Sequence, residues 1–229
     1  MSGFDLILFD CDGVLVDSEI IAAEVESKLL RDNGFEITAE EMCIRFAGMD
    51  WKSILMTIEK EAELPLSASL IDKSEALVDR ALSIRVKMIE GVRTALSRLT
   101  EQRCICSNSS SKRLDMMLTK VGLKPYFEGH IYSAKDLGPD RTKPKPDIYL
   151  HGAKQFDADP ARCLVIEDSV HGVHAARAAG MRVIGFTGGS HTYPTHADRL
   201  TDAGAETVIS RMTELPQMVD ALKSWSELA

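Results

Sequence analysis

Short apolar segments, each followed by a polar turn and a helical pattern, constrain the fold of this chain more than any other feature. They are Phe4–Phe9, Arg103–Cys106, Cys163–Ile166 and Arg182–Phe186, with a weaker one at Thr207–Ile209. Strands that are apolar on both sides are typical of a parallel sheet covered by helices on both faces. The sequence therefore predicts a doubly wound, Rossmann-like α/β core, in which ligands bind at the carboxyl ends of the strands.

The segment 17–87 interrupts this alternation with helical patterns alone. Its apolar residues recur at spacings of three and four, and Gly34, Gly48 and Pro65 mark breaks between helices. The expected helices are Ser18–Asn33, Ala39–Phe46, Trp51–Glu61 and Ser67–Val86. We therefore predict an all-helical cap domain over residues 17–87, inserted into a core of residues 1–16 and 88–229.

Charge and composition narrow the classes of partner. The 229 residues suffice for one domain with a smaller insertion, and the formal net charge of -8 disfavours nucleic acids and anionic membranes as partners. The apolar runs are too short to span a bilayer, and the N-terminus lacks the pattern of a secretion signal. The five cysteines form no Cys-x-x-Cys pair. We expect a cytoplasmic protein with reduced thiols, and its oligomeric state stays open.

Two aspartates follow the first predicted strand. Asp10 and Asp12 are separated by one residue, and side chains at i and i+2 point to the same side of a strand. Two such carboxylates repel, so their pKa values separate or they attract a cation. One can then act as a nucleophile and the other as an acid and base. A calcium-binding loop is excluded, because Val14 and Leu15 stand where it requires an oxygen ligand and a glycine.

A hydroxyl and a lysine occupy the next two candidate positions. Ser107 and Asn108 follow the strand Arg103–Cys106, where a hydroxyl can donate to a phosphate beside backbone N–H groups. A serine-rich helix cap explains the same residues. Lys143 begins a Lys-Pro-Lys-Pro segment, whose prolines favour an extended chain before a helix opens at Asp147. A solvated lysine pair is the alternative for this segment.

Two more carboxylates, Glu167 and Asp168, follow the strand Cys163–Ile166. Acidic residues on a buried strand rarely occur without a cation or a partner. Small residues between Gly172 and Gly180 then predict a helix that packs close to the sheet. Four carboxylates that converge with a hydroxyl and a lysine describe a magnesium site for phosphoryl transfer.

Together these motifs resemble the haloacid dehalogenase superfamily of phosphatases over nearly the whole chain. The resemblance rests on Asp-x-Asp-Gly-Val-Leu-Val-Asp-Ser from Asp10, Lys-Pro-x-Pro-Asp from Lys143, and Glu-Asp-Ser from Glu167 with its Gly- and Ala-rich helix. The position of the inserted helices is similar to that in members with a small helical cap, which include β-phosphoglucomutase and sugar-phosphate phosphatases. Thr142 departs from the glycine that many relatives have before the lysine.

The resemblance implies a role for each residue. Asp10 would attack phosphorus and form an aspartyl-phosphate. Asp12 would protonate the leaving oxygen and then take a proton from the water that hydrolyses this intermediate. The residues that would bind the phosphoryl oxygens are Ser107, Lys143 and Asn108.

Mg²⁺ is the implied cofactor, and a small phosphorylated metabolite is the implied substrate. The metal ligands would be Asp10, the backbone carbonyl of Asp12, Glu167 and Asp168. The metal charge would offset the repulsion between a carboxylate nucleophile and a phosphate dianion. Haloacid dehalogenases and phosphonoacetaldehyde hydrolases are disfavoured as functions, because they lack the second aspartate of the first motif.

The loop around Gly48 is the part of the cap expected to face the active site. Arg45, Trp51 and Lys52 flank this loop. Arg45 and Lys52 either bind an anionic or polyhydroxy leaving group or belong to a solvated surface. The segment 45–48 resembles 6-phosphogluconate phosphatases.

Two other functions compete with hydrolysis. Mutases of the β-phosphoglucomutase type carry a histidine and an arginine where this chain has Ala22 and Trp51, which disfavours a mutase. A phosphate-binding module without catalysis usually lacks a nucleophile or a metal carboxylate, whereas all four motifs are intact here. His191 and His196 follow the strand Arg182–Phe186, and we expect both at the rim or in solvent.

Overall fold

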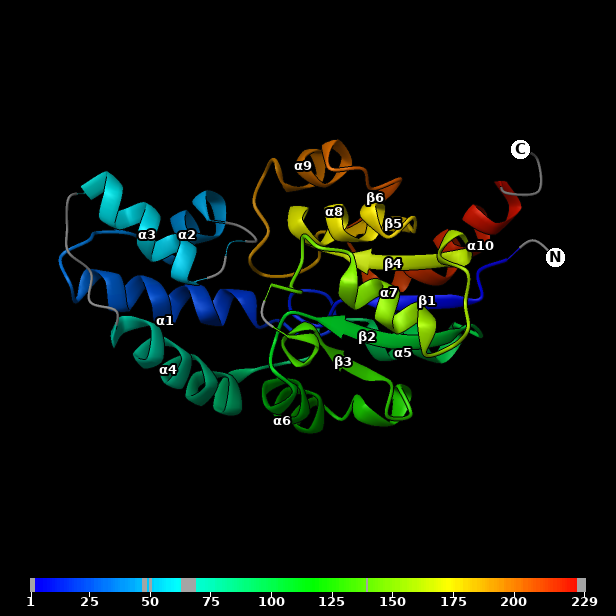
Figure 1. Cartoon of the computed structure of the whole chain (residues 1–229), viewed down its shortest axis with the longest axis horizontal. Coiled ribbons are helices and arrows are strands. Elements are labelled where there is room, and N and C mark those ends of the chain that lie inside the picture. Colours follow the sequence, from blue (N-terminus) through cyan, green and yellow to red (C-terminus); the bar gives the residue numbers. More distant parts are fainter. Residues whose placement is uncertain (1–2, 47–48, 50, 63–68, 139, 226–229) are drawn as a thin grey trace.

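The computed structural model describes residues 3–46, 49, 51–62, 69–138 and 140–225 of the chain. Six parallel strands form one sheet in the order β3-β2-β1-β4-β5-β6 (Figure 1). The strands are β1 Leu6–Phe9, β2 Gln102–Ser107, β3 Ile131–Ser133, β4 Cys163–Glu167, β5 Arg182–Phe186 and β6 Thr207–Ile209. The strand order changes direction between β1 and β4, and open α/β sheets bind their ligands at such a point.

Strand β1 lies at the centre of the sheet and is buried on both faces. All four of its side chains are inaccessible to solvent. Ile7 and Phe9 belong to one hydrophobic cluster, and Leu6 and Leu8 belong to a second one. Because successive side chains of a strand point to opposite faces, the two clusters lie on opposite sides of the sheet.

Helices cover both of these faces. Helices α5 (Val92–Arg98), α6 (Ser111–Val121) and α10 (Leu215–Trp225) pack on the face of Ile7 and Phe9. Helices α7 (Asp147–Lys154), α8 (Val170–Ala178) and α9 (His196–Asp202) pack on the face of Leu6 and Leu8. Short 3-10 turns occur at Lys124–Tyr126, Ala134–Leu137, Pro160–Arg162 and Met212–Glu214. The predicted α/β Rossmann-like fold is confirmed.

The described residues between β1 and α5 contain four helices, and the sequence predicts helices alone in this segment. They are α1 Glu19–Arg31, α2 Ala39–Arg45, α3 Trp51–Ala62 and α4 Ser69–Arg85. They contain a hydrophobic cluster of their own, which includes Leu30, Met42, Ile58 and Leu70. Figure 1 shows this helical region beyond the carboxyl ends of β2 and β4. The domain boundaries at 16/17 and 87/88 stay a prediction.

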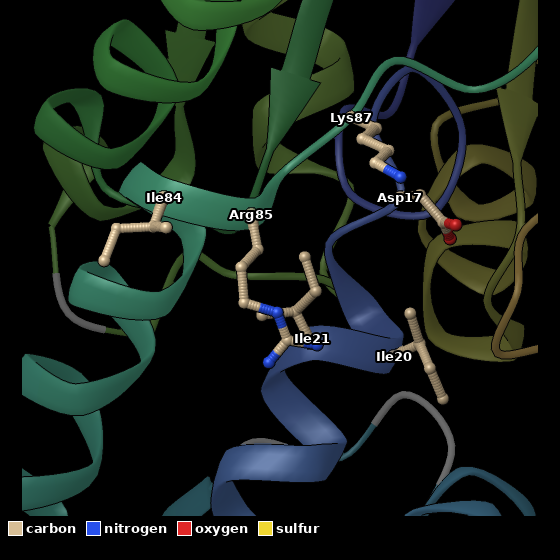
Figure 2. A pocket seen from close by; sticks show the side chains of 6 residues that line it. All are labelled: Asp17, Ile20, Ile21, Ile84, Arg85 and Lys87. Carbon is tan, nitrogen blue, oxygen red and sulfur yellow. The ribbon is translucent and has the colours of Figure 1, made fainter.

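Two chain crossings connect the helical region to the sheet, and they run side by side. The Asp17 N–H donates to the Lys87 carbonyl at 2.9 Å, and Val16 and Met88 form an antiparallel bridge. A cavity of about 440 Å³ lies beside the crossings. Its lining residues, shown in Figure 2, are Asp17, Ile20, Ile21, Ile84, Arg85 and Lys87. This cavity therefore lies beside the two connecting segments and not among the predicted catalytic residues.

The observed strands differ from the predicted ones mainly at their ends. Strands β2 and β4 reach Ser107 and Glu167, because these residues pair in register with Ser133 and Gly185. The sequence analysis does not predict β3, a strand of only three residues at one edge of the sheet. None of the helices in the described part of the chain is long and apolar enough to cross a membrane.

Candidate active site

The carboxyl ends of three central strands bring the predicted core residues together. Asp10 follows β1, Ser107 ends β2, and Glu167 ends β4 with Asp168 directly after it. Each of these side chains is buried, with at most 8% of the residue exposed. The parallel register explains the gathering, because β1 pairs with both β2 and β4 and their carboxyl ends meet at one edge.

Lys143 places its ammonium group between two of these carboxylates. Its Nζ lies 2.6 Å from Asp10 Oδ1 and 2.7 Å from Glu167 Oε1. Its ammonium also lies 4.8 Å from the ring centroid of Tyr149. The lysine side chain is only 4% exposed, so the alternative of a solvated lysine pair is wrong for Lys143.

Hydrogen bonds from four donors hold the Glu167 carboxylate. Besides Lys143, Tyr149 Oη donates to Oε1 at 2.9 Å, and the N–H and Oγ of Ser169 donate to Oε2 at 2.8 and 3.0 Å. Gly172 leaves room for this carboxylate, since a Cβ there would lie 1.6 Å from Oε1. Glu167 therefore anchors Lys143 beside Asp10.

The buried cluster contains more acidic groups than basic ones. Burial raises the pKa values of Asp10 and Asp168 well above their ordinary range, and the neighbouring Glu167 charge adds to both increases. Burial also acts on Glu167, but Lys143 and the hydrogen bonds outweigh it and lower the pKa of Glu167. Burial opposes the charge of Lys143, yet Asp10 and Glu167 raise its pKa, so the lysine stays protonated. One ammonium therefore faces three carboxylates.

This donor set fits a divalent cation. Ligand atoms of Asp10, Glu167 and Asp168 all lie within 4.8 Å of one another. Carboxylate oxygens are the ligands that Mg²⁺ prefers, and a cation would counteract both the burial and the repulsion that raise the pKa values of Asp10 and Asp168. The cluster is therefore compatible with metal binding.

Asp12 directs its carboxylate to serines. Ser18 Oγ donates to Oδ1 at 2.8 Å, and Ser107 Oγ donates to Oδ2 at 3.1 Å. Ser107 Oγ also accepts from the Ser109 N–H at 2.9 Å. The predicted acid and the predicted phosphate-binding hydroxyl are thus in direct contact, and the Asp12 side chain is not one of the clustered carboxylates.

Asn108 contacts the backbone of Lys143. Its Oδ1 accepts from the Lys143 N–H at 2.9 Å, and its Nδ2 lies 3.5 Å from the Lys143 carbonyl oxygen. The amide that the sequence assigns to phosphate binding therefore braces the segment that carries the lysine.

The predicted cap residues have their observed contacts inside the helical region. Arg45 pairs with Glu61 at 2.7 Å, and its guanidinium lies 5.0 Å from the ring of Phe46. Trp51 Nε1 donates to the Leu70 carbonyl at 3.2 Å, and Lys52 is exposed on α3. Among the described residues, no observed contact joins Arg45, Trp51 or Lys52 to the carboxylate cluster. Gly48 lies outside the described residues.

The expectation that His191 and His196 lie at the rim or in solvent is wrong. His191 is 9% exposed and His196 is 2% exposed. His191 Nε2 lies 3.0 Å from Asp168 Oδ2, and His196 Nε2 lies 2.6 Å from the Asp168 carbonyl oxygen. Burial lowers the pKa of both imidazoles, which favours their neutral form. A neutral imidazole can be buried where its N–H finds an acceptor.

Sequence reasoning also missed Tyr149 and Ser18. Tyr149 is an aromatic residue on the buried face of α7, so its spacing resembles that of ordinary core packing. Ser18 is the last residue of the first motif and directly precedes α1, and the sequence analysis gives its hydroxyl no role. Only their contacts with Glu167 and Asp12 reveal that both belong to the site.

Comparisons with known proteins find similar proteins over nearly the whole chain. Residues 7–186 match the sequence model of a family described as haloacid dehalogenase-like hydrolase. The chain is 28% identical over 226 residues to a 6-phosphogluconate phosphatase of Escherichia coli, which covers 98% of both proteins.

Two solved structures are similar over nearly the whole chain. A haloacid dehalogenase-like protein of unknown function from Agrobacterium tumefaciens is 73% identical, with a TM-score of 0.93 and coverage of 96% of this chain and 99% of that one. A hydrolase of the same family from Deinococcus radiodurans, solved with bound phosphate and sodium, is 33% identical with a TM-score of 0.81. That match covers 97% of this chain and 98% of the other.

Proposed function

Because the chain belongs to the haloacid dehalogenase-like hydrolase family and is a phosphatase, we propose that it hydrolyses phosphomonoesters of small metabolites, in particular sugar phosphates, through an aspartyl-phosphate. One observation carries the proposal. The Lys143 ammonium lies 2.6 Å from Asp10 within a cluster of buried carboxylates, so a cation already accompanies the nucleophile.

Asp10 attacks phosphorus in the first step. An Oδ–P bond forms while the bond between phosphorus and the leaving oxygen breaks. Lys143 opposes the increase in the pKa of Asp10 and so favours its ionised form, and it offers its remaining N–H to a phosphoryl oxygen. Ser107 Oγ is positioned at the end of β2 to donate to a second oxygen.

Asp12 moves the protons. It gives a proton to the leaving oxygen in the first step, and in the second step it takes one from the water that attacks the aspartyl-phosphate. Ser18 and Ser107 hold its carboxylate in one orientation. The products are inorganic phosphate and the alcohol, and Asp10 is regenerated.

Asp10, Asp168 and the backbone carbonyl of Asp12 would hold Mg²⁺ directly, and Glu167 would add negative charge beside them. When bound, the metal supplies positive charge that stabilises the negative charge on the transferring phosphoryl group. The four donors on Glu167 occupy both of its oxygens, so Asp10 and Asp168 are the side chains that we propose as direct ligands.

The proposed substrate class is a phosphorylated sugar or sugar acid, and the 6-phosphogluconate phosphatase relative supports it. A mutase remains the alternative. Ala22 stands on α1, where mutases carry a histidine, and it packs partly buried against the core cluster. Hydrolysis is therefore the better supported reaction. The cytoplasmic location and a partner set limited to small metabolites stay predictions.

Phosphate release tests the proposal. We would assay aldose, aldonate and polyol phosphates with and without Mg²⁺, with Asp10→Asn as the blank. Release that requires Mg²⁺ and disappears in the variant is the expected result. Isomerisation of a sugar phosphate faster than release would favour the mutase, and equal release by the variant would overturn the role of Asp10.

A further inference from the structure

The loop after β5 and the first residue of α9 direct two imidazoles, His191 and His196, at Asp168, and the proposed reaction gives neither of them a role. His191 Nε2 lies 3.0 Å from the carboxylate oxygen Oδ2, and His196 Nε2 lies 2.6 Å from the main-chain oxygen of the same residue. The two rings also contact each other edge to face, with centroids 5.5 Å apart. The loop thus contacts the side chain of Asp168, and the start of α9 contacts its backbone.

The contacts define where each ring carries its proton. The Asp168 carbonyl can only accept, so the His196 Nε2 carries the proton. In the described part of the chain, the Nδ1 atoms of both rings are buried and have no hydrogen-bond partner. A proton on the His191 Nδ1 would therefore leave a buried N–H unpaired and a lone pair facing the carboxylate. The proton of His191 belongs on Nε2, toward Asp168.

Two glycines make space for the contact between His191 and Asp168. A Cβ at Gly13 would lie 1.9 Å from Asp168 Oδ2 and 2.8 Å from His191 Cε1. A Cβ at Gly189 would lie 2.7 Å from both His191 Cε1 and Nδ1. Gly13 also has a φ of 73°, which disfavours other residues. The backbone on both sides is therefore shaped around this imidazole.

We propose that His191 is a positioning residue for the metal site, whose Nε2–H donates to Asp168 Oδ2 and holds this carboxylate in the cluster with Asp10. The inference rests on the proposed function, because it concerns the metal site of that reaction. His196 fixes the backbone of Asp168, and His191 fixes the rotation of its side chain. Partners that orient a metal-binding side chain typically change metal affinity by about 10–100-fold when removed.

Mg²⁺ binding to the metal-free protein, measured by isothermal titration calorimetry without substrate, tests this role. His191→Leu fills similar space and lacks a donor, and His191→Asn has a donor too short to reach Oδ2. His191→Gln can place its amide N–H near the position of Nε2. We expect His191→Leu and His191→Asn to weaken Mg²⁺ binding about 10–100-fold. We expect the Mg²⁺ affinity of His191→Gln to stay within about three-fold of the wild-type value.

Two control variants give the upper and lower limits of the expected Mg²⁺ affinities. His174→Leu changes an exposed histidine on α8 and is expected to leave the affinity unchanged. Asp168→Asn is expected to abolish measurable binding. Circular dichroism without Mg²⁺ verifies the fold of each variant. If His191→Leu does not fold, the comparison of His191→Asn with His191→Gln still decides the question.

The outcomes separate this inference from the proposed function. Wild-type affinity in His191→Asn would overturn the inference, and so would an equal loss in the Asn and Gln variants, because that pattern indicates packing alone. A wild-type protein that binds no Mg²⁺, or binds it equally well with Asp168→Asn, would overturn the metal site itself and the inference with it.

Discussion

The core and the helical region hold their charges in different ways. In the core, Lys143 and Glu167 pair at 2.7 Å with side chains 4% and 0% exposed. In the helical region, Arg45 and Glu61 pair at the same distance with side chains 43% and 48% exposed. A buried pair that loses one partner leaves an uncompensated charge, whereas an exposed pair contributes little. The comparison predicts a large effect from the loss of Lys143 or Glu167, and a small effect from the loss of Arg45 or Glu61.

The largest effect on activity is expected from a substitution of the proposed nucleophile in the core. Asp10→Asn removes the attacking carboxylate while it preserves shape, and loss of a nucleophile typically lowers turnover by about 10⁴-fold or more. Steady-state phosphate release, with protein purified free of host phosphatases, measures the loss. Substantial turnover in the variant would show that the buried cluster is not the reactive centre.

The second largest effect is expected at Lys143. Lys143→Met keeps the length of the side chain and removes the ammonium group from Asp10 and Glu167. We expect kcat to fall about 10²–10³-fold, as for the loss of one donor to a developing negative charge. Lys145→Met is the matched control, since Lys145 is two residues away and exposed. Similar kcat values for the two variants would contradict the role of the buried lysine.

A smaller effect is expected in the helical region, where it should appear in KM. Lys52→Ala removes an exposed cation near the start of α3, and we expect KM for anionic sugar-acid phosphates to rise about 1.5–5-fold with kcat unchanged. Arg45→Ala is the comparison, because Arg45 already pairs with Glu61 and should change KM less. An unchanged KM in Lys52→Ala would remove this lysine from the substrate site.

The smallest expected effect concerns stability and pH. Burial raises the pKa of Glu26 on α1 to about 8 from an ordinary 4.5, and Ser74 Oγ lies 3.5 Å from its Oε1. The folded protein therefore binds this proton more tightly than the unfolded chain, so the contribution of Glu26 to stability declines as pH rises from 4.5 toward 8. Glu26→Gln removes this pH-dependent loss of stability, because glutamine does not ionise.

Thermal unfolding at two pH values measures this difference. We expect Glu26→Gln to raise Tm above that of the wild type by about 2–4 °C near pH 9, and to leave Tm nearly unchanged near pH 5. Glu36→Gln, at an exposed position beyond α1, serves as the control. A gain of the same size at both pH values would indicate an effect unrelated to the titration of Glu26.

The strand ends explain why the core site could be predicted from the sequence. Asp10, Ser107 and Glu167 each follow an apolar segment, and parallel strands bring such positions to one edge. The contacts of His191 could not be predicted, because they depend on how a loop folds back onto Asp168, and no periodicity encodes that path. The same holds for Asn108, whose amide meets the Lys143 backbone through a contact across 35 positions of sequence.

In the helical region, the sequence predicts where the helices lie, but it does not predict which side chains bind a substrate. Its apolar spacing predicts α1 to α4 to within a few residues of their observed ends. Which cations bind a substrate depends on their partners, and Arg45 pairs with Glu61, a residue 16 positions away. Ion pairs of this kind leave no pattern in the sequence.

Chemical trapping of the covalent intermediate tests the central claim most directly. Borohydride reduces an acyl phosphate on an aspartate to homoserine, which mass spectrometry locates in the sequence. We predict homoserine at position 10 when enzyme, substrate and Mg²⁺ are present together, and none without substrate or in Asp10→Asn. Phosphate release at the normal rate, with an efficiently reduced control acyl phosphate and no homoserine at position 10, would contradict an aspartyl-phosphate mechanism.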